Sequence, residues 1–97
     1  MRFEILLAPE AIEDLRSLKA NVRAEVREAI EKHLRHEPEK KSRSRIKRLG
    51  GLSQPQYRLR VGEIRVFYDV LKSQVQVLAI VSKEEATKWL SGAGRPE

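Results

Sequence analysis

The chain has 97 residues, a length that predicts one domain with a modest hydrophobic core. It contains no cysteine, which excludes disulfides, thiolate metal sites and cysteine nucleophiles. No apolar run approaches the roughly 18 residues of a membrane span, and the first residues lack a signal-peptide pattern, so we expect a cytoplasmic protein. The net charge of +6 indicates a polyanionic partner: nucleic acid, the ribosome or an acidic protein.

The N-terminal third predicts one strand followed by two helices. Residues 2–7 predict a strand with Phe3, Ile5 and Leu7 on one side. Pro9 suits the first turn of a helix that continues to about Lys19. Asn21 is a plausible N-cap for a second helix, which Pro38 ends. Each helix has one apolar stripe, so the two form a hairpin that must cover a sheet or each other. The stripe of the second helix consists of Val22, Val26, Ala29, Ile30 and Leu34.

The only two histidines, His33 and His36, are three residues apart in this second helix. They could share a helix face, but no carboxylates near them complete a clear pattern of metal ligands. We therefore interpret them as solvated helix residues, and we expect neither a metal nor another cofactor.

Residues 40–48 form a basic segment, in which six of nine residues are Lys or Arg and none is acidic. The serine-rich part predicts a loop, and a short strand could begin at residues 46–49 and close at the glycine pair 50–51. A mobile basic loop can neutralise phosphates. The alternative for Lys47 and Arg48, in the short strand, is that they only keep a sheet edge soluble. The candidate substrate-binding residues here are Arg43, Arg45, Lys47 and Arg48.

Residues 57–68 predict a β-hairpin with a two-residue type II′ turn at residues 62–63. Side chains alternate across a sheet, so cross-strand partners share a face. One face of this hairpin carries Tyr57, Leu59, Val61, Ile64, Val66 and Tyr68 and belongs to the core. The opposite face carries Arg58, Arg60, Arg65 and Phe67.

This second face of the hairpin is unusual because Arg60 and Arg65 lie directly opposite each other. Facing like charges are destabilising, so a bound anion would explain the pair, and Phe67 would offer a stacking surface beside it. An exposed sheet face kept soluble by arginine explains the pattern equally well. A shift of the turn by one residue would break the pairing.

The C-terminal third predicts a turn at residues 71–74, an apolar and central strand over residues 75–81, and a last helix. Ser82 and Glu85 have the spacing of a capping box. Lys83 would then lie at a helix N-terminus, a favourable place for phosphate. Gly92 can end the helix, so we expect one domain over residues 1–92 and a disordered tail over residues 93–97.

The order of these elements predicts an α+β fold of two layers. The helical hairpin would pack on a mostly antiparallel sheet of four or five strands, with a short C-terminal helix after it. The arginine face of the sheet would remain open.

The chain resembles the RelE/ParE superfamily of toxins from type II toxin–antitoxin pairs. The resemblance covers nearly the whole chain and includes the segment 46–51. Its strongest part is the pattern Tyr-Arg-x-Arg-x-Gly-x-x-Arg-x-x-Tyr over residues 57–68, followed by the strand at residues 77–81. This pattern is specific to the superfamily but does not separate its branches.

The resemblance is closest to the RelE-like mRNA interferases and implies a metal-independent endoribonuclease that cleaves mRNA in the ribosomal A site. It also implies contacts with rRNA, and a cognate antitoxin that holds the toxin inactive in a heteromeric complex. The family's basic positions fall on Arg58 and Arg60, on Arg65, which would stabilise the phosphorane, and on Lys83. The position of the family's C-terminal tyrosine, which stacks on or orients the substrate, falls near Trp89.

The chain departs from that pattern at its candidate catalytic residues. Arg58 and Arg60 stand where lysines are usual in the best-known branch, and arginine is a poor general base because it stays protonated. Lys83 stands where an arginine is familiar in the family. Trp89 can stack on the substrate but lacks a phenolic proton, and a purely structural role, anchoring the last helix on the core, explains it equally well. A ParE-like inhibitor of DNA gyrase and a non-catalytic nucleic-acid-binding module remain the alternatives.

Overall fold

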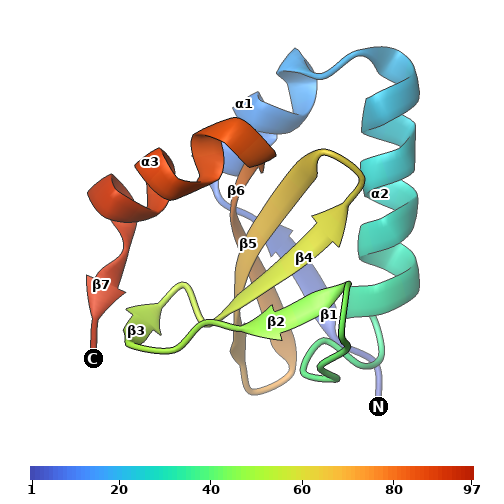
Figure 1. Cartoon of the computed structure of the whole chain (residues 1–97). Helices are drawn as coiled ribbons and strands as arrows, with labels where there is room; N and C mark the ends of the chain where they lie inside the picture. The colour runs from blue at the N-terminus through green and yellow to red at the C-terminus, as the bar shows by residue number, and fades with distance from the viewer.

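The computed structural model describes all 97 residues as one α+β unit (Figure 1). Five strands form the main sheet in the order β1-β6-β5-β4-β2, in which β1 is parallel to β6 and the other neighbours are antiparallel. A second, two-stranded sheet pairs β3 with β7. The elements are β1 (Glu4–Leu7), α1 (Pro9–Ser17), α2 (Ala20–Leu34), β2 (Ile46–Arg48), β3 (Leu52–Gln54), β4 (Tyr57–Val61), β5 (Ile64–Leu71), β6 (Gln74–Ser82), α3 (Lys83–Ala93) and β7 (Arg95–Pro96).

The two N-terminal helices form the expected hairpin, but α2 begins one residue before the predicted cap. Pro9 is the first residue of α1, where its missing N–H costs no hydrogen bond. The prediction that Asn21 caps α2 is wrong, because the extended Lys19 is the N-cap and supplies no side-chain cap. The carbonyl of Lys19 accepts the first helical hydrogen bond, from the amide of Arg23 at 2.8 Å. No helix of the structure is both long and apolar enough to cross a membrane.

The hydrophobic core lies between the helical hairpin and one face of the main sheet. The apolar stripe of α2 supplies three fully or nearly buried residues, Val26, Ile30 and Leu34. The apolar face of the β4–β5 hairpin contributes its predicted residues to the same core. These contacts explain why two short helices with poor caps are stable here, since burial of an apolar face rather than propensity supplies most helix stability in proteins.

The register of the central hairpin is the predicted one. Tyr57 pairs with Tyr68, and Val61 pairs with Ile64 at the turn. Within the two-residue turn only Gly62 has a positive φ, of 58°, as the first central residue of a type II′ turn does. This register places the arginines on the face of the sheet that the helical hairpin does not cover.

The C-terminal segment follows the prediction in its strand and differs from it in two details. The strand β6 is an interior strand, as predicted, and pairs with β1 on one side and β5 on the other. Ser82 caps α3 as predicted, and its hydroxyl accepts the amide of Glu85, but the helix continues past Gly92 to Ala93. The last residues do not form the predicted disordered tail, because Arg95–Pro96 pairs with β3 and the amide of Glu97 donates to the carbonyl of Gly51 at 3.2 Å.

Candidate nucleic-acid interface

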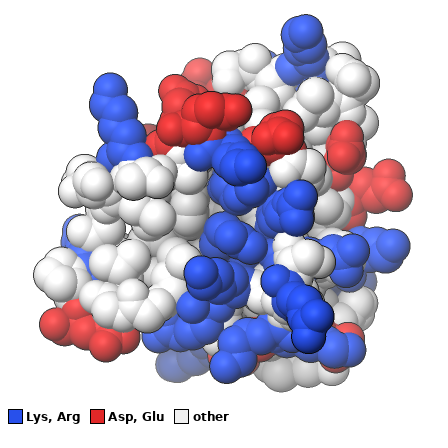
Figure 2. All heavy atoms as spheres, in the orientation of Figure 1, with Lys and Arg blue, Asp and Glu red and all other residues white.

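The sheet surface opposite the helical hairpin carries a cluster of cations, which we call the basic face: Lys47, Arg58, Arg60 and Arg65. The strand pairing places Lys47 beside Arg58, and Arg60 beside Arg65. These pairs put three neighbouring strands, β2, β4 and β5, under one cationic surface. Figure 2 shows the result as a strip of Lys and Arg side chains down the middle of the molecule.

Arg58 is the most constrained cation of the basic face. It is half-buried, and its Nε is buried without a hydrogen-bond partner. Burial, followed by the charges of Arg65 and Arg60, lowers the pKa of Arg58 below its ordinary value. The three ion pairs of the protein lie elsewhere and include none of these arginines. The face therefore holds cations close together without an internal counter-ion, and a bound phosphate would supply the missing negative charge.

Arg65 has a structural role that the sequence did not reveal. Its Nη1 donates to the carbonyls of Gly62 at 2.9 Å and Ile64 at 3.1 Å, so the guanidinium holds the hairpin turn. The amide of Lys83 donates to the carbonyl of Glu63 at 2.7 Å, which ties the start of α3 to the same turn. The structure thus places the backbone of Lys83 next to the turn that Arg65 holds, at one end of the basic face.

Phe67 cannot be the open stacking surface that the sequence predicted, because Trp89 covers it. The two rings stack with centroids 4.9 Å apart and an angle of 15° between their planes. Phe67 is only 1% exposed. Trp89 therefore anchors α3 onto the sheet, one of the two roles predicted for it, and α3 closes the part of the arginine face that was expected to stay open.

Arg48 does not belong to the basic face. It pairs with Tyr57, one position along β2 from Lys47, and successive side chains of a strand point to opposite faces. Its Nη1 donates to the carbonyls of Leu49 and Gln56 at 3.0 and 2.9 Å, and its guanidinium lies 5.4 Å from the centre of the Tyr57 ring. The prediction that Arg48 binds substrate is therefore replaced by a role in holding the end of β2.

The loop before β2 places its two predicted cations differently. The amide of Arg60 donates to the carbonyl of Arg45 at 2.8 Å, so Arg45 lies next to the basic face. Arg43 is exposed on the loop, with no hydrogen bond or ion pair to fix its side chain. Arg45 therefore extends the basic face toward α2.

Tyr57 and Tyr68 lie on the predicted core face of the hairpin and are packing residues with tethered hydroxyls. Their rings stack at 5.4 Å. The Tyr68 hydroxyl donates to the carbonyl of Pro38 at 2.6 Å, and the Tyr57 hydroxyl donates to Glu39 at 3.4 Å. Burial raises the pKa of both phenols, most strongly for Tyr68. Neither hydroxyl is placed to take part in chemistry on the opposite face.

A buried carboxylate near this surface, Asp69, was missed by the sequence analysis. It lies two residues beyond Phe67 on β5, is 4% exposed, and accepts hydrogen bonds from Gln54 Nε2 and the Gln56 amide, both at 2.8 Å. These bonds hold the connection between β3 and β4. The only signal for Asp69 in the sequence is an acidic residue directly after an apolar run. In the structure its role is to hold this connection through the two hydrogen bonds.

The chemical capacity of the basic face is therefore binding and charge stabilisation. Guanidinium groups bind phosphate oxygens through paired donors, and the ammonium of Lys83 adds three further N–H donors. No group of three or more His, Cys, Asp or Glu side chains is arranged to hold a metal ion. The fold and the site together define a small α+β protein with a cationic surface on its sheet.

Comparison with known proteins identifies the family. The sequence matches the family described as the ParE toxin of the type II toxin–antitoxin system parDE over residues 5–87, so the chain belongs to that family. It is accordingly a toxin of a type II toxin–antitoxin system, of the RelE/ParE kind. A search of curated protein sequences finds no match.

Solved toxin structures share the fold of this chain. The archaeal RelE–RelB complex of Pyrococcus horikoshii OT3 matches with a TM-score of 0.69 and 22% identity over 86% of this chain and 97% of that one. The RelB–RelE complex of Methanococcus jannaschii matches with a TM-score of 0.65 and 19% identity, over 87% and 96% of the two chains. A mutant of the E. coli toxin RelE in its free state matches with a TM-score of 0.58 and 20% identity, over 96% of this chain and 95% of that one.

Proposed function

We propose that this toxin is a ribosome-dependent mRNA endonuclease that binds its substrate on the basic face. The observation that carries the proposal is the half-buried guanidinium of Arg58, which lies near Arg60 and Arg65 and whose Nε has no hydrogen-bond partner. A folded protein retains such a cluster at a cost in stability, and a phosphate group bound across it would offset that cost.

The proposed reaction is attack by a ribose 2′-oxygen on the adjacent phosphorus. The bond from the 2′-oxygen to phosphorus forms and the bond to the 5′-oxygen breaks, which leaves a 2′,3′-cyclic phosphate. Arg60 and Arg65 stabilise the charge on the phosphorane, and Lys83 gives a proton to the leaving 5′-oxygen. Water takes the proton of the 2′-hydroxyl, because an arginine stays protonated. Orientation on the ribosome and charge stabilisation then supply most of the rate enhancement.

The proposed partner that silences the toxin is a cognate antitoxin. Two of the similar solved structures are complexes of RelE with RelB, and this chain shares their fold. An acidic, amphipathic segment of such a partner would cover the basic face or the helical hairpin. The same surface would contact rRNA when the toxin is free.

A second candidate function, inhibition of DNA gyrase, is favoured by the family match, which names the ParE toxin. Gyrase inhibition needs the fold and a binding surface, but it needs no residues for phosphoryl transfer. The absence of an evident proton acceptor among Lys47, Arg58, Arg60 and Arg65 is consistent with this alternative.

Primer extension on a reporter mRNA after brief induction of the toxin distinguishes the two functions. One transcript is translatable and the matched transcript lacks its start codon. We expect new 5′ ends only in the translated transcript. We also expect their loss in Arg60→Ala, which removes an exposed side chain that takes part in no hydrogen bond or ion pair. Lys88→Ala, which removes an exposed cation of α3, is the control and retains cleavage. Growth arrest with both transcripts intact would refute the nuclease and favour gyrase.

A further inference from the structure

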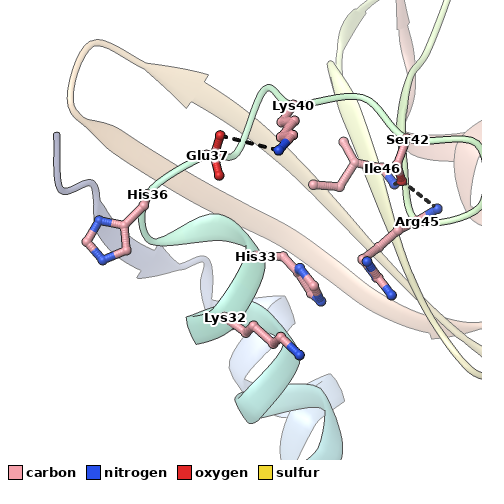
Figure 3. Close-up of a pocket in the computed structure, with 8 residues that line it drawn as sticks. All are labelled: Lys32, His33, His36, Glu37, Lys40, Ser42, Arg45 and Ile46. Atoms are coloured by element: carbon pink, nitrogen blue, oxygen red, sulfur yellow. Dashed lines mark hydrogen bonds and ion pairs between the residues drawn. The ribbon is translucent and has the colours of Figure 1, made fainter.

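A cationic pocket lies beside the basic face, between the C-terminal end of α2 and the loop before β2. Its volume is about 190 Å³, and its lining includes Lys32, His33, Lys40, Ser42 and Arg45. Figure 3 shows that the side chains of Lys32, His33 and Arg45 converge, whereas His36 turns away from them. The pocket is several times larger than the roughly 30 Å³ that one water occupies in the liquid, so it admits a phosphate group.

The pocket contains cations that no carboxylate neutralises. Glu37 also lines it, but its carboxylate pairs with Lys40 at 3.8 Å. Lys32 and Arg45 take part in none of the three ion pairs of the protein. Burial, together with the charges of Arg45 and Lys32, lowers the pKa of the half-buried His33. An anion placed between these three side chains would relieve their mutual repulsion.

The loop that forms one wall of this pocket is fixed before any ligand binds. The Ser42 hydroxyl accepts hydrogen bonds from the amides of Arg45 at 2.9 Å and Ile46 at 3.1 Å. The Ser42 amide in turn donates to the carbonyl of Ile46 at 2.9 Å. This closed turn fixes the backbone at Arg45 near the end of α2, so little backbone entropy is lost when a ligand binds.

The pocket is continuous with the basic face. A neighbouring hollow of about 270 Å³ shares Lys32, His33 and Arg45 with it and extends to Arg60. The backbone bond from Arg60 to Arg45 fixes the two arginines relative to each other. One strand of nucleic acid can therefore run from Arg60 past Arg45 into the pocket, although Glu25 and Glu28 also line this hollow.

We propose that this pocket is a second phosphate site, which holds one phosphodiester of the RNA strand whose scissile phosphate lies on the basic face. The inference rests on the proposed nuclease function and adds a specific contact to it. The chemistry favours RNA over an acidic peptide, because Ile46 is the only hydrophobic residue in the pocket lining. An amphipathic peptide would need an apolar groove for its anchoring side chains, whereas a phosphodiester needs only donors and positive charge.

Histidine NMR on the full-length wild-type toxin tests the site directly. The probe is the dinucleotide UpU, whose single phosphodiester does not titrate near neutral pH, and the controls are uridine and tetraglutamate. We expect UpU to move the titration midpoint of His33 to higher pH, because a nearby anion favours the imidazolium. His36→Gln assigns the two histidine signals. The charged groups that face His33 are Lys32, His36, Glu37, Lys40 and Arg45, with Glu25, Glu28 and Arg60 across the shared hollow.

The outcome does not depend on cleavage, so it separates this inference from the nuclease proposal. If UpU leaves the titration midpoint of His33 unchanged, the phosphate site is overturned. This holds whether or not UpU changes the amide NMR signals of β4 on the basic face. A shift as large with tetraglutamate overturns the assignment to RNA. A UpU-specific shift together with intact mRNA in cells retains a phosphate site in a toxin that is not a nuclease.

Salt dependence provides a second measurement of the same site. We expect Arg45→Ala to reduce the slope of log affinity against log salt for a single-stranded RNA by about 0.7, the value for one lost phosphate contact. Lys88→Ala, which removes an exposed charge on α3, leaves the slope unchanged. Equal slopes for wild type and Arg45→Ala would contradict the proposal.

Discussion

Replacement of Arg58 by methionine should stabilise the toxin while it abolishes function. The side chain is half-buried, its Nε has no partner, and Arg60 and Arg65 lie beside it. A buried donor without a partner costs about 1–3 kcal/mol. Methionine keeps an unbranched apolar side chain of similar length but removes that donor and the repulsion. Because the group is only half-buried, we take the low end and expect a gain of about 1 kcal/mol, or roughly 4–8 °C in Tm.

Thermal unfolding followed by circular dichroism measures this effect. Arg60→Met is the matched control, because it removes the same charge from an exposed position and should change stability by less than about 0.5 kcal/mol. Added salt should stabilise the wild type more than Arg58→Met, since it screens the repulsion among the arginines. If Arg58→Met melts below the wild type, the guanidinium contributes to stability, and the argument that it is retained for a ligand fails.

Three further predictions concern contacts away from the basic face. Tyr68→Phe should cost about 1–2 kcal/mol in urea unfolding, because it leaves the buried carbonyl of Pro38 without its donor; a loss below half that range would contradict this role. Trp89→Ala should uncover Phe67 and cost about 2–4 kcal/mol by calorimetry, whereas Trp89→Phe retains most of the stability; equal losses would argue against the stack. The folded state lowers the pKa of His33, so the unfolded chain takes up its proton first and stability falls as pH drops below about 6.5. In His33→Gln, the midpoint of urea unfolding should therefore depend less on pH between about pH 7 and pH 5 than in the wild type. The same pH dependence in both proteins would refute the linkage.

Features set by local chemistry could be predicted from the sequence. The turn at Gly62 and the alternation on either side of it determine the hairpin register, which the structure reproduces pair by pair. The capping position of Ser82 follows in the same way from residues within one helical turn. These patterns involve neighbours in the chain, so no knowledge of the tertiary structure is needed to interpret them.

Apart from the N-cap of α2, which is a local error, the errors concern contacts between distant segments. Whether Phe67 is open depends on where α3 packs, and the sequence does not show that Trp89 reaches it. The face on which Arg48 lies depends on the pairing of β2 with β4, where a shift of one residue reverses every side chain. His33 looks like a solvated helix residue until the turn around Ser42 brings Arg45 beside it. Each missed feature requires the tertiary structure.

The positive charge of this toxin comes from one short stretch of its sequence. Residues 40–62 contain eight Lys or Arg residues and no Asp or Glu, so the other 74 residues hold 12 basic and 14 acidic residues and are slightly acidic. The stretch includes Arg45 of the pocket and three of the four cations of the basic face. Affinity for any polyanion, and its dependence on salt, should therefore be determined by these residues. An antitoxin that acts by charge complementarity has to cover this same stretch, since the remainder of the chain offers an acidic partner no net attraction.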